Sequence, residues 1–344
     1  MPSRARLRSG GGGYVEVVPA DMAALAERLY GDAAAVDAAD SIPPAHLGAL
    51  AAAGLYGALA PKERGGLGLD VPGLCAVVEE LASACLATTF VWIQHLDLLG
   101  TLLDPAAPPV LREMLPKVVS GEVRSGIALA GLRSGMPGLR ARELAGGWLL
   151  DGEASWVSGW GLVDVLLVAA RGPDDSAVRL VVDAREQLGL SVTRLRLSAL
   201  DATCTARIAF EGLFVAEERV ASRRPYDPTT EQREGLRVNG SLALGLVRRC
   251  CTLLGPSALD DELVGCRDDL DVAGPDAIAG ARARASELAV RAAHVLSVRQ
   301  GSRSVLAGDV AERLAREAAM LLVFGSRPAI RRSLLERLGA PLSR

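Results

Sequence analysis

The pattern of apolar and polar positions divides the chain into a helical part, a strand-rich part and a second helical part. From Asp21 to about Leu103, apolar residues recur at intervals of three and four, as on one face of a helix. Between Val123 and Val220 the apolar runs are short, often alternating, and separated by Gly, Pro and Asp, which is typical of strands joined by turns. Helical spacing then returns after a polar connector. This order predicts an α+β fold, mainly α.

The changes of pattern also give domain boundaries. The first residues, "MPSRARLRSGGGG", offer nothing to bury, so they predict a disordered tail. Short strands at close spacing predict an antiparallel barrel or sandwich, and narrow alanine-rich helix faces predict a bundle. The expected parts are a disordered tail (1–13), an N-terminal helical domain (14–122), a central antiparallel β-barrel or sandwich (123–222) and a C-terminal helical bundle (223–344).

Two helical regions have distinctive faces. Residues 71–103 are too apolar for a surface helix, so one helix or a pair of helices is expected inside a bundle or against another subunit. Farther on, one helix face is expected to be narrow and closely packed, with Ala281, Ala285, Leu288, Ala292 and Val295. The apolar excess of 77–103 and of "EAAMLLVFGS" predicts a dimer or tetramer formed through the C-terminal bundle.

Composition excludes several classes of protein. Half of the residues are hydrophobic, 23% are charged and the formal charge is -3, so neither a disordered chain nor a nucleic-acid-binding protein is indicated. The six cysteines form no C-x-x-C pair and no histidine stands at metal-ligand spacing, so no metal site is expected. No apolar run of about 18 residues occurs, and a glycine tract follows the basic N-terminus; these features predict a cytoplasmic protein without a membrane segment.

The stretch "SWVSGWG", residues 155–161, places two of the four tryptophans on one short turn between strand-like runs. An indole there has two interpretations. It is either an ordinary core residue at the edge of a barrel, or a planar neighbour for a flat apolar ligand. The second interpretation requires that side chains do not pack tightly around the indole.

Four stretches, in this order, carry a family resemblance that extends from about Met22 to Gly339. They are "SIPPAHLGALAAAGLYGALAPKERGGLGLD", "GGWLLDGEASWVSGWGLVDVLLVAAR", "TARIAFEGLFVAEERVAS" and "LAREAAMLLVFGSRPAIRRSLLERLG". Together they resemble the acyl-CoA dehydrogenase family of flavoproteins. The resemblance implies an FAD-dependent oxidoreductase that acts on the CH–CH group of an acyl thioester, carried by coenzyme A or an acyl carrier.

The resemblance also implies a cofactor site. By position, the indole of Trp156 lies against the flavin ring and the hydroxyl of Ser158 lies near the ring atom N5. A large planar neighbour suits a flat ring, and a hydroxyl at N5 tunes its electronic properties. Main-chain groups of Leu129, Ala130 and Gly131 are expected to bond the edge of the flavin, because backbone groups do not depend on side-chain identity.

Other family features are replaced. The loop "T-E-P-x-A-G-S-D" reads Ala130 to Pro137 here, with its Thr, Glu, Pro, Ser and Asp all replaced, and Arg133 is the candidate that compensates at the pyrophosphate or the coenzyme A tail. The segment "R-x-x-F-G" is absent and the C-terminal "Q-x-x-G-G" is reduced to 323–325. Both come from a neighbouring subunit in the family, so FAD occupancy across a dimer interface stays open.

The usual catalytic glutamate is not found at its family position. A base must be a carboxylate within hydrogen-bond reach of the substrate, in apolar surroundings. Glu234 is the candidate, because it precedes Arg237 by three residues and the two are expected on one side of a helix; the alternative is a solvated glutamate at a helix start. Arg237 and His95 are candidate substrate contacts, and for His95 the alternative is a core histidine held by hydrogen bonds. His46 is expected on a helix surface.

Three functional hypotheses remain open at this point. The first is an acyl-CoA dehydrogenase-type flavoenzyme. The second is a catalytically degenerate subunit that pairs with an active homologue in a hetero-oligomer. The third is other chemistry in the same cavity, such as flavin-dependent hydroxylation or a flavin-free rearrangement, which fold alone does not exclude.

Overall fold

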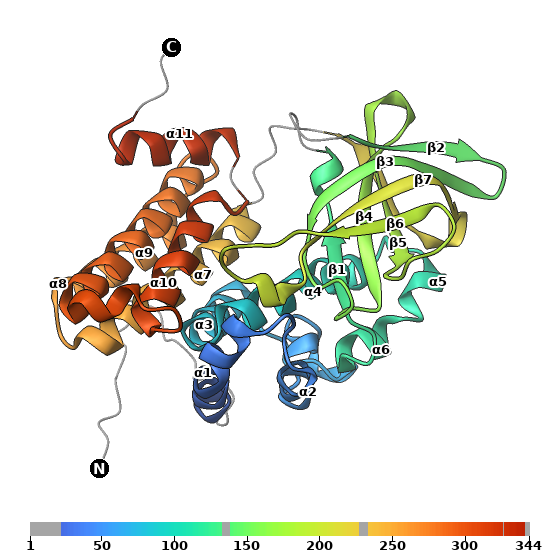
Figure 1. Cartoon of the computed structure of the whole chain (residues 1–344). Helices are drawn as coiled ribbons and strands as arrows, with labels where there is room; N and C mark the ends of the chain where they lie inside the picture. The colour runs from blue at the N-terminus through green and yellow to red at the C-terminus, as the bar shows by residue number, and fades with distance from the viewer. Residues whose placement is uncertain (1–21, 133–137, 227–232, 326, 341–344) are drawn as a thin grey trace.

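The computed structural model describes residues 22–132, 138–226, 233–325 and 327–340. Figure 1 shows the β-sheet on one side, the C-terminal helices on the other, and the N-terminal helices below and between them. The helix–strand–helix order expected from the sequence is therefore the order observed. The expected disordered tail, residues 1–13, lies outside the described residues.

The N-terminal part is a set of helices packed around one very apolar helix, α4. Residues 71–103 form two helices, because Cys85 between them has an extended backbone (φ -145°, ψ 102°). By length and composition α4 also meets the criteria for a membrane span, but 78% of that stretch is buried inside the protein, as in a core helix. The helices are α1 (Met22–Ala38), α2 (Pro44–Ala52), α3 (Val71–Ala84), α4 (Leu86–Leu103), α5 (Pro109–Arg112) and α6 (Leu115–Ser120).

The central part is one sheet with the strand order β6-β7-β3-β2-β4-β5-β8, and β1 pairs with β4. The pairings β1–β4 and β2–β4 are parallel and the others are antiparallel, so the expectation of an antiparallel sheet is corrected to a mixed one. Alternation in the sequence marks a strand but not its direction, which here is set by the connection from β1 across to β4. The strands are β1 (Ser125–Ala128), β2 (Leu139–Leu144), β3 (Gly147–Val157), β4 (Val165–Arg171), β5 (Ser176–Asp183), β6 (Leu190–Arg194), β7 (Ala206–Ala216) and β8 (Val220–Pro225).

The C-terminal part is a helical bundle, and α7 joins it to the rest of the protein by packing on α3. On α9 the expected face is only partly right. Ala285, Leu288 and Ala292 are buried, whereas Val295 is 42% exposed. The buried stripe continues through Leu296 instead, because a helical repeat of 3.6 residues drifts from strict spacing. The helices are α7 (Arg233–Leu254), α8 (Ala258–Val272), α9 (Ile278–Gln300), α10 (Val310–Val323) and α11 (Pro328–Arg337).

Helix α4 connects the helical part to the sheet. It packs against β1, and a Cβ added to Gly159, just after β3, would lie 3.4 Å from a methyl group of Val91. On its other side, Phe90 makes an edge-to-face contact with Phe324 at the end of α10, with ring centroids 4.6 Å apart. The end of β3 therefore lies against the first half of α4.

Candidate functional site

Two chain segments predicted to share a site lie side by side in the structure. One is the end of β1 and the short 3-10 turn η3 (Ala130–Leu132); the other is the end of β3. A Cβ added to Gly131 would lie 3.1 Å from the carbonyl oxygen of Glu153, and one added to Gly126 would lie 3.1 Å from that of Ser158. Since both distances are close contacts, the fold brings the segment 126–131 together with the segment 153–158.

Trp156 occupies an unusual position at the end of β3. The register between β3 and β7 shifts between Ala154 and Val157, as at a β-bulge. Within this irregularity Trp156 has φ +63°, a left-handed conformation that is rare for a bulky residue and costs about 1–3 kcal/mol. Its side chain is 59% exposed. The indole is therefore not a packed core residue, and one of the two sequence interpretations is excluded.

Behind the indole, the hydroxyl of Ser158 is buried and hydrogen-bonded. It lies 2.8 Å from the hydroxyl of Thr205, which lies 2.8 Å from that of Thr203. The backbone N–H of Gly159 donates to the carbonyl oxygen of Thr203 at 2.8 Å, so the turn after β3 is fixed to the start of β7. Sequence reasoning missed both threonines, because they are 45 and 47 residues from Ser158 and nothing local marks them.

His95 was a candidate substrate contact, but its ring is buried in the core. The ring is 1% exposed, its Nδ1 accepts a hydrogen bond from the N–H of Ser125, and its Nε2 donates to the carbonyl oxygen of Val118, both at 3.1 Å. Burial lowers the pKa of His95 to about 4, so the ring is neutral. Neither ring nitrogen is left for a substrate, and the geometry is that of the core histidine considered as the alternative.

Arg237 and Glu234 lie three residues apart on α7, on roughly the same side, but they differ in burial. Arg237 is buried, and its Nε donates to Oδ1 of Asp271 at 2.6 Å while Nη1 donates to the hydroxyl of Ser241 at 2.7 Å. These bonds link α7 to α8. Glu234, in the first turn of α7, is exposed. The guanidinium is thus engaged within the bundle, and Glu234 lacks the apolar surroundings expected of a base. Arg133 lies outside the described residues.

The expectation that His46 lies on a surface is wrong. The ring is buried; its Nε2 donates to Asp32 at 3.1 Å and its Nδ1 accepts from the hydroxyl of Thr88 at 3.0 Å. The helical periodicity around His46 gave no indication of this, because Thr88 comes from a different helix. His46 therefore links α1, α2 and α4 rather than facing solvent.

Glu317 on α10 is a buried carboxyl group that the sequence analysis did not single out. Burial raises its pKa to about 7, while the nearby guanidinium of Arg313 acts in the opposite direction. It stands next to the apolar stripe of Leu314, Ala318 and Leu321, and from the sequence this position could have indicated that Glu317 is buried. A carboxyl group whose pKa lies near neutrality is a titratable feature of the bundle interior.

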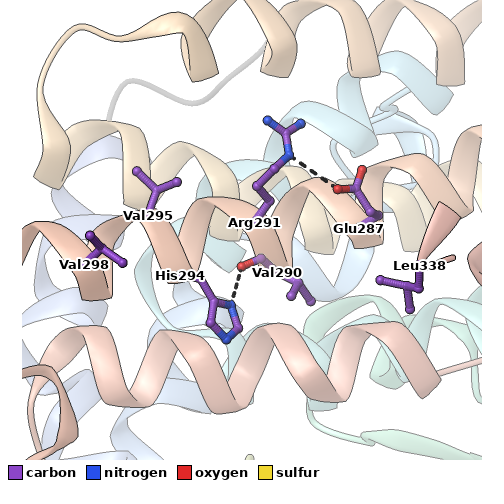
Figure 2. A pocket seen from close by; sticks show the side chains of 7 residues that line it. All are labelled: Glu287, Val290, Arg291, His294, Val295, Val298 and Leu338. Carbon is purple, nitrogen blue, oxygen red and sulfur yellow. Dashed lines mark hydrogen bonds and ion pairs between the residues drawn. The ribbon is translucent and has the colours of Figure 1, made fainter.

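A surface groove of about 480 Å³ lies elsewhere, along α9 and beside Leu338, the residue that follows α11 (Figure 2). In Figure 2 Arg291 pairs with Glu287 at 3.3 Å, and Nδ1 of His294 donates to the carbonyl oxygen of Val290 at 2.7 Å. None of the predicted site residues lines this groove. Among the described residues, no group of three or more His, Cys, Asp or Glu side chains is arranged to hold a metal ion.

Comparison with known proteins connects the chain to one group of flavoproteins. The family model for the acyl-CoA dehydrogenase N-terminal domain matches residues 21–122. Benzylmalonyl-CoA dehydrogenase of Aromatoleum aromaticum is 26% identical over 237 residues, which is 64% of this chain and 62% of that enzyme. The chain thus spans less than two thirds of the length of this relative.

Solved structures with the same fold cover nearly the whole chain. Butyryl-CoA dehydrogenase from Megasphaera elsdenii superposes with a TM-score of 0.81 over 96% of this chain and all of that one, at 14% identity. A nitrososynthase from Micromonospora carbonacea superposes with a TM-score of 0.75 over 93% of this chain and 94% of that one, at 22% identity. At these identities the structures show a shared fold. The names of the two proteins also show that one fold carries different chemistries.

Proposed function

The chain belongs to the acyl-CoA dehydrogenase family, and from this premise we propose that it is an FAD-dependent oxidoreductase acting on the CH–CH group of an acyl thioester. The observation that carries the proposal is the strained, exposed indole of Trp156 at the end of β3, where the segments 126–131 and 153–158 meet. Trp156 is exposed, so the free energy of burying its indole does not offset the cost of its unfavourable backbone conformation. A flat apolar ligand that covers the indole would bury it and so stabilise this conformation.

The described residues fit an isoalloxazine ring at this place. Trp156 would provide the planar surface, the hydroxyl of Ser158 would lie at the N5 edge, and main-chain groups of Leu129, Ala130 and Gly131 would face another edge of the ring. When bound, the flavin would supply the two-electron acceptor that removal of a hydride from an acyl group requires. The chain's own contribution is to bind and orient the ring and to keep water from one of its sides.

The second candidate function is a flavin-binding subunit that depends on a homologous partner for proton removal. The observation that favours it is that the candidate polar groups on the helical side are already occupied or unsuitable. Both nitrogens of His95 and the guanidinium of Arg237 are hydrogen-bonded within the protein, and Glu234 is exposed. A base for the α-proton needs a free polar atom near the substrate. The oligomeric state stays a prediction, which size-exclusion chromatography with light scattering measures directly.

The experiment that tests the proposal begins with flavin occupancy. The purified protein, with FAD added, is expected to be yellow, and anaerobic addition of an acyl-CoA is expected to bleach the absorbance. Trp156→Ala is expected to weaken FAD binding about tenfold, because an aromatic contact of this size contributes about 1–2 kcal/mol. Affinity is measured by equilibrium dialysis.

The matched control is Phe214→Ala, which removes another exposed aromatic side chain from the same sheet, on β7. FAD affinity is expected to stay within twofold of the unaltered protein. Equal affinity in Trp156→Ala and the unaltered protein would exclude the ring site at Trp156. Bound flavin that no acyl-CoA bleaches would instead favour the partner-dependent subunit, and co-expression with a homologous subunit would then be expected to restore bleaching.

A further inference from the structure

Three buried hydroxyl groups form a line that ends on a backbone carbonyl. The hydroxyls of Ser158 and Thr205 are 2.8 Å apart, those of Thr205 and Thr203 are 2.8 Å apart, and the hydroxyl of Thr203 lies 2.7 Å from the carbonyl oxygen of Leu200. All three side chains are buried. The line starts two residues after Trp156 and leads away from it into the protein.

The direction of every hydrogen bond in this line is fixed by counting protons. A hydroxyl group has one proton, and a carbonyl oxygen has none. Thr203 must therefore donate to Leu200. Its proton being used, Thr203 accepts from Thr205, and Thr205 in turn accepts from Ser158. The chain of donation runs from Ser158 to Thr205 to Thr203 to Leu200.

This direction determines what Ser158 offers to a ligand. Its single proton is donated to Thr205, so its oxygen presents lone pairs and acts as an acceptor. To donate outward, the whole line would have to reverse, and the carbonyl oxygen of Leu200 would lose the hydroxyl bond while keeping the one from the N–H of Thr203. A buried hydrogen bond given up in this way biases the line toward the acceptor state.

We propose that Thr205 and Thr203 are positioning residues that hold the Ser158 hydroxyl as an acceptor and so favour the reduced form of the ring bound beside Trp156. The inference rests on the proposed function. Oxidised isoalloxazine carries no hydrogen on N5, whereas the two-electron-reduced ring carries an N–H there. An acceptor at that edge binds the reduced ring more tightly than the oxidised one, which raises the reduction potential of the bound flavin.

The test compares midpoint potentials of the FAD-loaded protein. Thr205→Val keeps the shape of the side chain but removes the acceptor for Ser158, so Ser158 becomes free to donate to the oxidised ring. The ratio of reduced to oxidised binding is expected to fall about tenfold, the size of one hydrogen bond. For a two-electron couple this is a drop of about 30 mV. Thr205→Ser retains the hydroxyl and is expected to restore the potential.

A second background separates positioning from a structural effect. In Ser158→Ala protein the line has no first member, so adding Thr205→Val is expected to leave the potential unchanged. An equal drop in both backgrounds, or no drop in Thr205→Val with FAD bound normally, overturns the inference while the proposed flavin site stands. Absence of FAD binding by the unaltered protein overturns both, and occupancy measured before each titration distinguishes the two failures.

Discussion

The two sides of the candidate site use their polar and aromatic groups in opposite ways. On the sheet side, Trp156 is exposed at a bulge, and the proton arrangement of the hydroxyl line leaves Ser158 with an acceptor for a ligand. On the helical side, His95 and Arg237 are buried in bonds that join one element to another. The difference teaches that residues chosen from sequence as ligand contacts stay open to solvent where the backbone is strained, as at Trp156, and are used in bonds between elements where it is regular and packed, as at His95 and Arg237.

The largest expected effect concerns the helical side. Asp271→Ala leaves the buried guanidinium of Arg237 without its carboxylate, and breaking a buried pair in this way lowers the free energy of unfolding by about 3–4 kcal/mol. FAD affinity of the folded protein is expected to remain within twofold. Urea unfolding and equilibrium dialysis measure the two quantities.

The control for this change is Asp269→Ala on the same helix, whose ion pair with Arg284 is more exposed and contributes less than about 1 kcal/mol. A tenfold loss of FAD affinity in Asp271→Ala, without loss in the control, would show that Arg237 contributes to FAD binding, contrary to the difference drawn between the two sides.

A slightly smaller effect concerns the pH dependence of two buried groups on the helical side, His95 and Glu317. The pKa of His95 is lowered to about 4 in the folded protein, against a reference of 6.5, so below pH 6.5 the unfolded chain takes up a proton that the folded one does not. Stability is lost as the pH falls from 6.5 toward 4, by about 3 kcal/mol. The pKa of Glu317 is raised to about 7 from 4.5, so its contribution is present below pH 4.5 and is lost as the pH rises through 7.

The two groups therefore have opposite slopes in the same window, and substitution reveals each of them. Relative to the unaltered protein, His95→Gln is expected to gain stability as the pH falls from 6.5 to 4.5, and Glu317→Gln is expected to gain stability as the pH rises over that interval. Urea unfolding at pH 4.5, 5.5 and 6.5 measures both. Slopes of the same sign in the two variants would show that one of these environments is misassigned.

The smallest expected effect is that of Glu234→Gln. Because the side chain is exposed in the first turn of α7, the free energy of unfolding is expected to change by less than about 0.5 kcal/mol. FAD binding and the rate of bleaching by an acyl-CoA are expected to be unchanged. A hundredfold slower bleaching at full FAD occupancy would instead identify Glu234 as the base and move the chemistry to the helical side.

The general fold was accessible from sequence because burial imposes periodicity. Helical spacing and strand alternation identify the three parts, but they carry no information on partners distant in the chain. The parallel pairing of β1 with β4 and the burial of His46 both depend on such partners. In each of these places the local pattern was compatible with two outcomes.

The same limit applies to the site. The turn of Trp156 stands out by its two tryptophans and the segment 129–131 by its position in the family resemblance, and the fold brings the surrounding segments 153–158 and 126–131 together. Thr205 was missed since an ordinary threonine near a strand start gives no signal until the fold places it beside Ser158. Arg237 became a candidate substrate contact through the family resemblance, and its partner Asp271, 34 residues away, gave no local signal against it.

The open position of Trp156 has an optical consequence. Of the four tryptophans, Trp92 and Trp148 are buried, Trp160 is partly buried and Trp156 alone is exposed. Because its indole is surrounded by water, Trp156 is expected to emit at longer wavelengths than the buried indoles. Aqueous quenchers such as iodide readily reach Trp156 but not the buried tryptophans. The protein therefore carries an intrinsic spectroscopic probe at the end of β3, whose shielding reports when something covers that surface.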